Sequence, residues 1–475
     1  TADNFTLIFA VFIGWIVMAI ALFGWMVFCA SSIVQLIRKN AQRTRSVELT
    51  VLIMLTLQSL NPMLFILLPT MINCISAVFR LRMLFLSFFA SVTITLFPAL
   101  NPLIVFYYRW ARLYPKGPTP YPLLGNLVQL NPQAIYNDLA TFGKKFGSVF
   151  TVFTPRPMVV LSDYEAIKEA FVSKADDFSQ RPQQRFFELL SPTKDGGVAA
   201  ANGQSWQVRR RTAIGALRDL GMGRNIMEEK YVVSDVINEV MFGFRYDRKN
   251  CQEFMNFIDF LTNVCDEQLL YICIDFFFAA QDTTTTTLRW AMIHLAEKQH
   301  IQDKLRGEIL SVVGTSRLPS ISDKPNLPYL SATIYEVLRT ANILALNLPH
   351  EATVDTEVMG HKIPAKTYIN ADLHNVLAND PHYKQPDLFC PERFLNADGR
   401  TLNKEAVDRC IAFSLGRRQC AGESLARMEL FLIIAATIQK YRLSVPEGVT
   451  FDHKPVSFFA LHPNKNIRIV VRPVA

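Results

Sequence analysis

Three long apolar stretches dominate the first quarter of the chain. They cover residues 5–36, roughly 50–79 and about 83–108, with arginines and lysines between them. Each stretch is long enough to cross a bilayer, which takes about 20 residues of helix. The pattern therefore predicts three transmembrane helices within residues 1–108. Since basic loops stay on the cytoplasmic side, the basic loop after the first stretch puts Thr1 outside and the chain after the third stretch inside.

A proline-rich connector separates this region from the rest of the chain. Four prolines between residues 115 and 122 make the stretch 109–126 stiff and extended, which marks a domain boundary. Beyond it, residues 133–180 read as a helix, two strands and a second helix. Residues 271–298 and 423–441 read as long helices, and the C-terminal tail suggests a closing hairpin.

Composition and charge narrow the possible partners. Hydrophobic residues make up 50% of the chain and mean hydropathy is +0.18, which is high for a soluble protein. The net charge of +8 is spread without a long basic run, which disfavours nucleic acid and favours an anionic membrane face or an acidic protein. Eight scattered cysteines argue against structural zinc and a disulfide framework. Because the chain starts at Thr1 and not Met, we expect a processed product, a fragment or an incomplete gene model.

The stretch FSLGRRQCAG, residues 413–422, carries the clearest chemistry. Its two glycines, Gly416 and Gly422, allow a sharp turn and a close approach to a flat ligand. Cys420 directly precedes a helical run, where free N–H groups and the helix dipole favour a thiolate, a candidate ligand for haem iron. Arg418 could donate charge-assisted bonds to a haem propionate. The alternative is that Cys420 is an ordinary buried free cysteine.

This decapeptide resembles the haem-binding loop of the cytochrome P450 monooxygenases. All five fixed positions of that loop match, namely Phe413, Gly416, Arg418, Cys420 and Gly422. The resemblance covers about residues 113–475 with one internal gap. It implies a mostly α-helical P450 fold with small β-sheets in residues 127–475. It also implies haem b (iron protoporphyrin IX) as the cofactor, with Cys420 as the iron ligand and the other four residues around the haem.

The same resemblance assigns three further residues to the haem propionates. Trp206 and Arg210 lie four apart and share one face of a predicted helix. His350 matches the third propionate-binding position. Without the resemblance, the first pair would be read as part of a solvated basic face and the histidine as a satisfied surface residue.

Residues 271–298 resemble the family's central helix, which crosses the haem face where dioxygen binds. Asp282 and Thr283 match its adjacent acid and alcohol, which implies a catalytic role in delivering protons to dioxygen. Ala280 stands where the family generally has glycine. Thr283–Thr287 is a run of five β-branched residues, poor for an isolated helix, so the alternative is a polar patch that interrupts the helix.

Three charged residues match a structural feature of the family. Glu336 and Arg339 are spaced i,i+3 on a predicted helix, and Arg393 lies in the segment PERF. In the family the corresponding residues form a buried ion network behind the haem, which we expect here. The alternative is an ordinary surface pair on a helix.

One part of the family pattern is too short. Only 76 positions separate Trp206 from Asp282, where the family has further helices that roof the substrate pocket. We therefore predict a domain shortened between about 225 and 275 by a deletion or a lost exon. An open roof would admit water and threaten activity. Phe458 and Phe459, in a tail loop that touches substrate in the family, are additional candidate pocket residues.

The end of the third apolar stretch, LFPALNPLIVFYYR, resembles the last helix of nematode-type seven-transmembrane chemoreceptors. Its proline pair and Asn101 carry the resemblance. We interpret residues 1–108 as the last three helices of such a receptor, joined to an enzyme in the genome or by an error in the gene model. The alternative is an unusual membrane anchor without receptor ancestry.

Together the resemblances imply a multi-pass membrane protein of the endoplasmic reticulum with a cytosolic haem domain. It would insert one atom of O2 into a small apolar substrate, such as a xenobiotic, a steroid or a fatty-acid-like molecule. Electrons would come from an NADPH-dependent flavoprotein reductase that docks on Arg209, Arg211 and Arg417. One alternative is a non-catalytic membrane protein, a chemoreceptor fragment fused to a degenerate haem domain. Another is a haem carrier or sensor.

Overall fold

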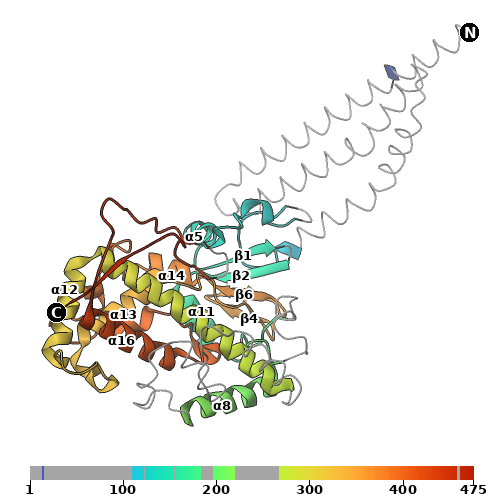
Figure 1. Cartoon of the computed structure of the whole chain (residues 1–475). Coiled ribbons are helices and arrows are strands. Elements are labelled where there is room, and N and C mark those ends of the chain that lie inside the picture. Colours follow the sequence, from blue (N-terminus) through green and yellow to red (C-terminus); the bar gives the residue numbers. More distant parts are fainter. Residues whose placement is uncertain are drawn as a thin grey trace, which may run out of the picture. The chain divides into compact units, whose positions relative to one another are not determined.

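The computed structural model describes residues 13–14, 110–121, 124–154, 156–182, 196–219, 267–456 and 460–474 (Figure 1). The chain divides into two compact units, one of Thr1–Leu113 with Thr119–Gly125 and one of Tyr114–Pro118 with Asn126–Ala475. Apart from residues 13–14, the three predicted membrane helices lie outside the described residues, as does most of the stretch predicted to be shortened. No helix in the part of the chain that the structure describes is long and apolar enough to cross a membrane.

The second unit combines helices with short strands. Its α-helices are α5 (Ile135–Phe146), α6 (Tyr164–Lys168), α8 (Gly203–Asp219), α11 (Glu267–Glu297), α12 (Gln299–Val313), α13 (Pro328–Ala341), α14 (Leu373–Asn379), α15 (Lys404–Arg409) and α16 (Glu423–Lys440). Its strands are β1 (Val149–Thr154), β2 (Arg156–Leu161), β3 (His350–Glu351), β4 (Thr356–Val358), β5 (His361–Ile363), β6 (Tyr368–Ala371), β7 (Tyr441–Ser444) and β8 (Val470–Pro473). Short 3-10 helices are η2 (Leu127–Gln129), η5 (Ile321–Asn326), η6 (Pro391–Phe394) and η7 (Gly416–Arg418), and the π-helical η3 (Glu169–Ser173) continues α6.

One sheet joins the start of this unit to its middle. Its strand order is β1-β2-β6-β3, with β2 antiparallel to β1, parallel to β6, and β3 antiparallel to β6. The predicted order of helix, two strands and helix is present, and the Asp163 carboxylate caps α6 by accepting from the Ala166 N–H at 2.8 Å. Pairing with β6 sets His350 opposite Ile369 and so places this histidine at the sheet edge.

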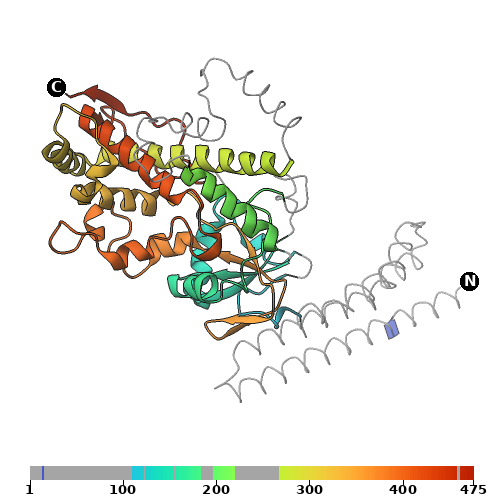
Figure 2. The same cartoon turned by 90° about the horizontal axis from the view of Figure 1, so that it is seen from below.

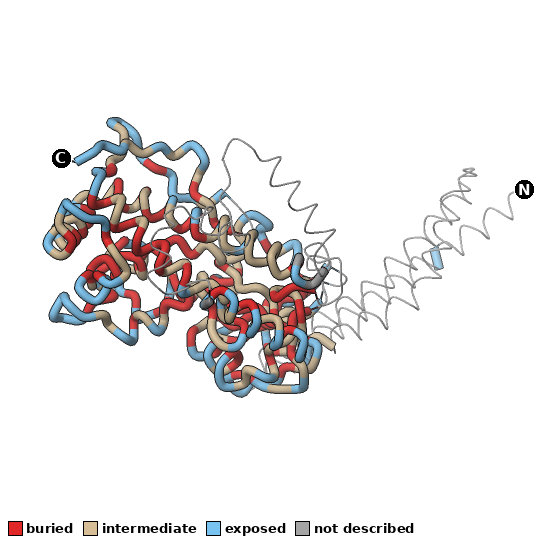
Figure 3. The backbone as a smooth tube through the Cα atoms, turned by 60° about the horizontal axis from the view of Figure 1, so that its bottom comes forward, coloured by how far each residue is buried: buried red, intermediate tan, exposed pale blue. Residues whose placement is uncertain are grey.

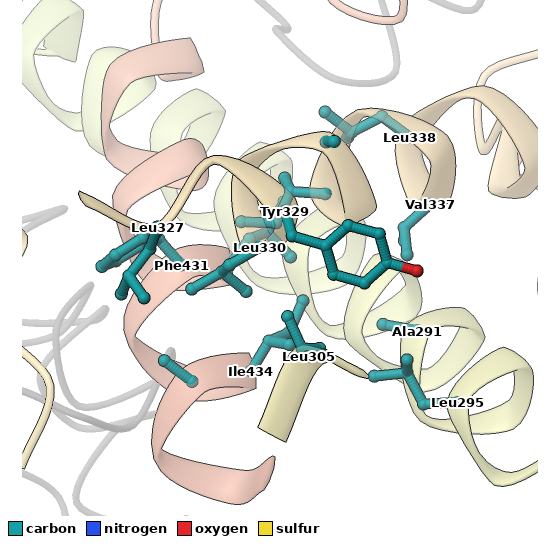
Figure 4. Close-up of a cluster of buried hydrophobic side chains, with 14 of the residues drawn as sticks. Ala291, Leu295, Leu305, Leu327, Tyr329, Leu330, Val337, Leu338, Phe431 and Ile434 are labelled. Atoms are coloured by element: carbon teal, nitrogen blue, oxygen red, sulfur yellow. The ribbon is translucent and has the colours of Figure 1, made fainter. Parts of the chain in front are cut away.

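The main core lies among α11, α12, α13 and α16, on the side of the unit away from the sheet (Figures 1 and 2). Leu295, Leu305, Leu330 and Phe431 are at most 1% exposed, and Figure 4 shows them converging from all four helices. Buried positions, red in Figure 3, concentrate on these helices and on the sheet. Each such side chain contributes about 1.5–3 kcal/mol when buried, so this core decides how the helices pack.

Helix α11 runs without interruption through Thr283–Thr287, so the alternative of a helix-breaking polar patch is wrong. Thr283 and Thr287 donate their hydroxyls to the carbonyls four residues earlier, at 2.7 and 2.9 Å. The propensity cost is at most about 0.7 kcal/mol per threonine. Burial of Trp290 and Leu295 on the same helix outweighs that cost.

The C-terminal tail does not form the predicted hairpin within its described residues. Its strand β8 pairs instead with β7, which directly follows α16. Between them, the Trp290 indole donates to the Leu461 carbonyl at 2.8 Å and so holds the tail against α11. Within the tail, the Val456 N–H donates to the His462 carbonyl at 3.0 Å. Phe458 and Phe459 lie outside the described residues.

Candidate functional site

Cys420 lies between the single turn η7 and the first residue of α16. Its backbone N–H donates to the Phe413 carbonyl at 3.0 Å, which closes the loop. The thiol is exposed to solvent, yet burial by surrounding protein raises its pKa. A small ligand can therefore reach this thiol although protein surrounds it.

The electrostatics of Cys420 differ from the sequence-based expectation of a favoured thiolate. Burial raises the thiol pKa by more than the N–H groups of Gly422 and Glu423 and the Arg210 guanidinium lower it. The chain alone therefore favours the neutral thiol. Coordination to a metal ion would reverse this preference, because it deprotonates a thiol outright.

The two loop glycines have different surroundings. Gly416 has φ +76°, and a Cβ there would collide with the Phe171 carbonyl of η3. The lack of a side chain at this position is therefore required by packing within the protein. A Cβ on Gly422, which caps α16, would meet nothing within 4 Å. Phe413 packs under the Arg427 guanidinium, 4.9 Å from its ring centre.

A cationic cluster lies beside this loop. We use this name for Arg181, Arg210 and Arg418, together with the imidazole of His350, which lies among them and is neutral in the chain alone. The predicted pair Trp206 and Arg210 lies on α8, which runs beside α11 in Figure 2. The Arg418 guanidinium stacks 3.8 Å above the Trp206 ring, and Arg210 donates to the carbonyl of Gln419, next to Cys420. The structure thus brings the predicted propionate residues and the cysteine loop together.

No negative charge within the described part of the chain balances the cluster. Arg181, His350 and Arg418 are at most 8% exposed, and no carboxylate among the described residues pairs with any member. Burial lowers the pKa of Arg181 to about 9, with Arg210 adding to the effect. Burial also lowers the pKa of Arg418 to about 8, and the charges of Arg181 and Arg210 add to this effect. A guanidinium does not lose its proton near neutral pH. The folded chain therefore bears the free-energy cost of burying these charges until an anion binds and offsets it.

Protein carbonyls position the cluster without neutralising it. Arg418 donates to the carbonyls of Ser179 and Ala201 at 2.8 and 2.6 Å, and Arg181 donates to those of Leu348 and Pro349. His350 bonds the Phe178 carbonyl through Nδ1 at 2.7 Å, and burial lowers its pKa well below 6.5.

Two residues of this arrangement were missed by the sequence analysis. Asp275 on α11 accepts the N–H groups of Val198 and Ala199 at 2.7 and 2.9 Å, which anchors the loop that holds Arg418. Arg181 belongs to the cluster itself. It leaves no periodic signal because it sits in a loop. The only available hint is that an arginine precedes Pro182 directly after a predicted helix.

The residues present fit a haem with two carboxylates. Besides the unbalanced cations, the buried Trp206 Nε1 and Arg181 Nε have no hydrogen-bond partner among the described residues. Buried donors without partners are costly, and propionate oxygens would satisfy both the donors and the charge. An accessible thiol next to such a cluster fits a haem-thiolate protein.

Asp282 and Thr283 lie on α11 but do not bond each other. The Thr283 hydroxyl is donated back to Ala279, while Asp282 Oδ2 lies 3.3 Å from Nε2 of His462 in the tail. The other ring nitrogen of His462 lies 3.0 Å from the Thr286 hydroxyl. His462 was not found from the sequence, since nothing local connects it to a residue 180 positions earlier.

The three predicted ion-network residues do meet. Glu336 accepts from Arg339 Nε at 2.8 Å and from Arg393 Nε at 3.1 Å, and its side chain is 0% exposed. The Cys390 N–H adds a bond at 2.8 Å. Arg339 also donates to the carbonyls of Leu377 and Pro386. Every charge in this network is therefore paired and hydrogen-bonded.

Comparison with known proteins agrees with the site. The sequence profile of the cytochrome P450 family matches residues 115–230 and 261–470. Cytochrome P450 2K1 from Oncorhynchus mykiss is 31% identical, over 79% of this chain and 96% of its own length. Cytochrome P450 2B2 from Rattus norvegicus is 30% identical, over 74% and 93% respectively. The profile of the serpentine 7TM GPCR chemoreceptors of the Str type matches residues 3–108.

The fold and site define the class, a haem-thiolate oxidoreductase with a helical domain and small sheets. The comparisons identify the family: the chain belongs to the cytochrome P450s. It is a monooxygenase with haem b as its cofactor, and like its family it takes electrons from a redox partner and acts on small substrates. The N-terminal 108 residues are similar to a chemoreceptor segment, as expected. The non-catalytic alternative is not favoured.

Proposed function

We propose that Cys420 would hold the haem iron in a membrane-bound monooxygenase that oxidises a small apolar substrate, such as a xenobiotic, a steroid or a fatty-acid-like molecule. The observation that supports this most is an accessible thiol beside a buried cationic cluster that pairs with no carboxylate among the described residues. When bound, haem b supplies the activation of dioxygen. We propose an NADPH-dependent flavoprotein reductase as the electron donor.

The cationic cluster would hold the two propionates, together with the Trp206 indole. Phe413, Gly416 and Gly422 would complete the haem-binding loop. His350 plays a conditional part. Its Nδ1–H is donated to Phe178, so Nε2 can donate to a propionate only when the ring is protonated. A nearby carboxylate favours that form by raising the pKa.

Asp282 and Thr283 are the proposed proton-delivery residues. The Asp282 side chain is 57% exposed, so it can exchange protons with solvent. Its contact with His462 adds a second titratable group to the route. Thr283 lies one residue further along α11 and has a hydroxyl that can change partner from Ala279 to a ligand.

The shortening between about 225 and 275 remains part of the proposal. The P450 profile matches in two pieces that break between residues 230 and 261. In the comparison with cytochrome P450 2K1, 79% of 475 residues is about 375, against 490 aligned positions. About 115 positions of that alignment therefore have no residue in this chain. We propose that residues 127–475 form the haem domain, with an incomplete cover over the substrate.

We propose that residues 1–108 attach the domain to the endoplasmic reticulum membrane through several spans, with 109–126 as the linker. The similarity of residues 3–108 to a seven-transmembrane receptor profile supports this attachment. The haem domain would then face the cytosol, where a reductase can reach it.

The test is the difference spectrum of the reduced, carbon monoxide-bound chain expressed in membranes. We expect a Soret band at the thiolate position, and its loss in Cys420→Ser. Cys390→Ser is the matched control and should keep the band, because it removes a free cysteine at the start of η6, outside the haem-binding loop. A band at the neutral-thiol position in the wild type, or equal spectra for wild type and Cys420→Ser, would overturn the proposal.

The reductase surface has its own test. Arg417 is exposed and pairs with Asp176 on the surface near the haem loop. Arg417→Glu should lower the rate of reductase-driven turnover about tenfold at low salt and less at high salt. Arg400→Glu, on the exposed turn before α15, is the matched control. Unchanged turnover in Arg417→Glu would exclude this docking face. Haem binding without any turnover would instead favour a carrier or sensor.

A further inference from the structure

Three side chains converge at the C-terminal end of α11, apart from the residues assigned to the haem. His294 and Glu297 are spaced i,i+3 and share one helix face, and His453 comes from the segment after β7. One ligand atom from each residue lies within 4.8 Å of the other two. Nε2 of His453 is 3.0 Å from Oε1 of Glu297. These residues provide two imidazoles and one carboxylate from two separate elements.

A neighbouring threonine determines the tautomer of His294. The Thr340 hydroxyl donates to the Glu336 carbonyl at 2.8 Å and also lies 3.3 Å from His294 Nε2. Since its single proton is given to the carbonyl, this hydroxyl accepts from Nε2–H. Nδ1 of His294 is then the nitrogen with a free lone pair. A metal-bound histidine typically donates its other N–H in this way, which orients the ring.

The ring of His294 is also held by stacking. It lies 4.6 Å from the Phe389 ring and 5.8 Å from the parallel His453 ring. Two cationic side chains, Lys298 and Arg339, lie near enough to act on His294 electrostatically. The cationic neighbours oppose a metal ion only partly, because Arg339 is already paired with Glu336 and Glu297 brings a negative charge.

We propose that His294, Glu297 and His453 bind one Zn²⁺ ion or a similar borderline divalent transition metal. Two imidazoles and a carboxylate suit zinc and leave a fourth position for a small ligand, whereas Mg²⁺ and Ca²⁺ prefer oxygen ligands. The ion would join α11 to the segment after β7. That segment leads to His462, which contacts Asp282, so zinc would steady the tail at the proposed proton-delivery residues.

The test is a zinc titration of the full-length, haem-loaded chain in detergent after treatment with a chelator. Competition with a chromogenic chelator gives the dissociation constant, and elemental analysis gives the stoichiometry. We expect one zinc per chain, and at least about tenfold weaker binding in Glu297→Gln and in His453→Gln. These two side chains are partly exposed, so both variants should keep the haem spectrum of the wild type.

Two further variants separate this site from adventitious binding. Thr340→Val removes the hydroxyl that orients His294 and should weaken zinc binding about tenfold without removing a ligand. His382→Gln is the matched control, because His382 also contacts two carboxylates, Asp380 and Glu405, but lies outside the trio. No stoichiometric zinc in the wild type, or equal affinities in wild type, Glu297→Gln and His453→Gln, would overturn the proposal.

Discussion

The second unit contains two sets of buried arginines that differ in whether a carboxylate of the described residues neutralises them. In the ion network, Arg339 and Arg393 both pair with Glu336, whose side chain is 0% exposed. In the cationic cluster, Arg181 and Arg418 are also deeply buried, but within the described residues they bond only carbonyls and an amide side chain. The first set is complete within the chain. The charge of the second set is not neutralised by the described residues.

This difference separates structural charges from ligand-binding charges. A buried charge that the chain itself neutralises belongs to the fold, because removing its partner leaves an uncompensated ion. A buried charge without a partner costs folding free energy, which an anionic ligand can offset on binding. Variants in the ion network should therefore mainly lower stability, and variants in the cationic cluster should mainly lower haem affinity.

The largest effect is expected at the ion network. Glu336→Gln should lower the free energy of unfolding by about 3–5 kcal/mol, because two buried guanidinium groups lose the carboxylate that they share. Chemical denaturation of the chain with and without haem measures it. Asp303→Asn is the control, since its pair with Arg442 is half exposed and should change stability by less than about 1 kcal/mol. Similar losses in both variants would contradict the contrast.

Glu429 on α16 shows a third way to manage a buried charge. It is 6% exposed, its Oε1 has no hydrogen-bond partner among the described residues, and burial raises its pKa to about 8. The folded state thus holds a proton that the unfolded state releases above about pH 4.5. Between about pH 4.5 and 8 the unfolded state binds fewer protons, so stability falls as the pH rises.

Glu429→Gln should remove most of that pH dependence, on the order of 3 kcal/mol between pH 5 and 8.5. The variant should be as stable as the wild type at pH 5 and more stable at pH 8.5. Thermal melts across this range measure the effect. Parallel melting curves for the two proteins would show that Glu429 does not titrate in this window.

The smallest effect on folding is expected in the cationic cluster. Arg418→Gln should make haem loss to an acceptor protein about tenfold faster, equivalent to about 1.4 kcal/mol, because one propionate partner is removed. The haem-free chain should be no less stable than the wild type, since an uncompensated charge has gone. Arg400→Gln on the surface is the control. Destabilisation of the haem-free chain by Arg418→Gln would place this residue with the structural charges.

Much of the fold could be predicted from the sequence because its signals are local. The Asp163 cap, the long helix α11 and the paired strands β1 and β2 follow from periodicity and capping over a few residues. The threonine run in α11 shows where local propensity misleads. Buried contacts with other helices outweighed it.

The sequence by itself determined that the residues of the decapeptide around Cys420 lie together, and likewise the i,i+3 pair Glu336 and Arg339. Residues close along the chain stay close in any fold. Only the tertiary structure decided that Arg181 lies beside Arg418 and that His462 meets Asp282. It also decided that Asp275 on α11 anchors the loop at Val198. These residues come from segments far apart in the sequence. Packing of buried side chains brings them together, and no local pattern records where that packing will place a polar group.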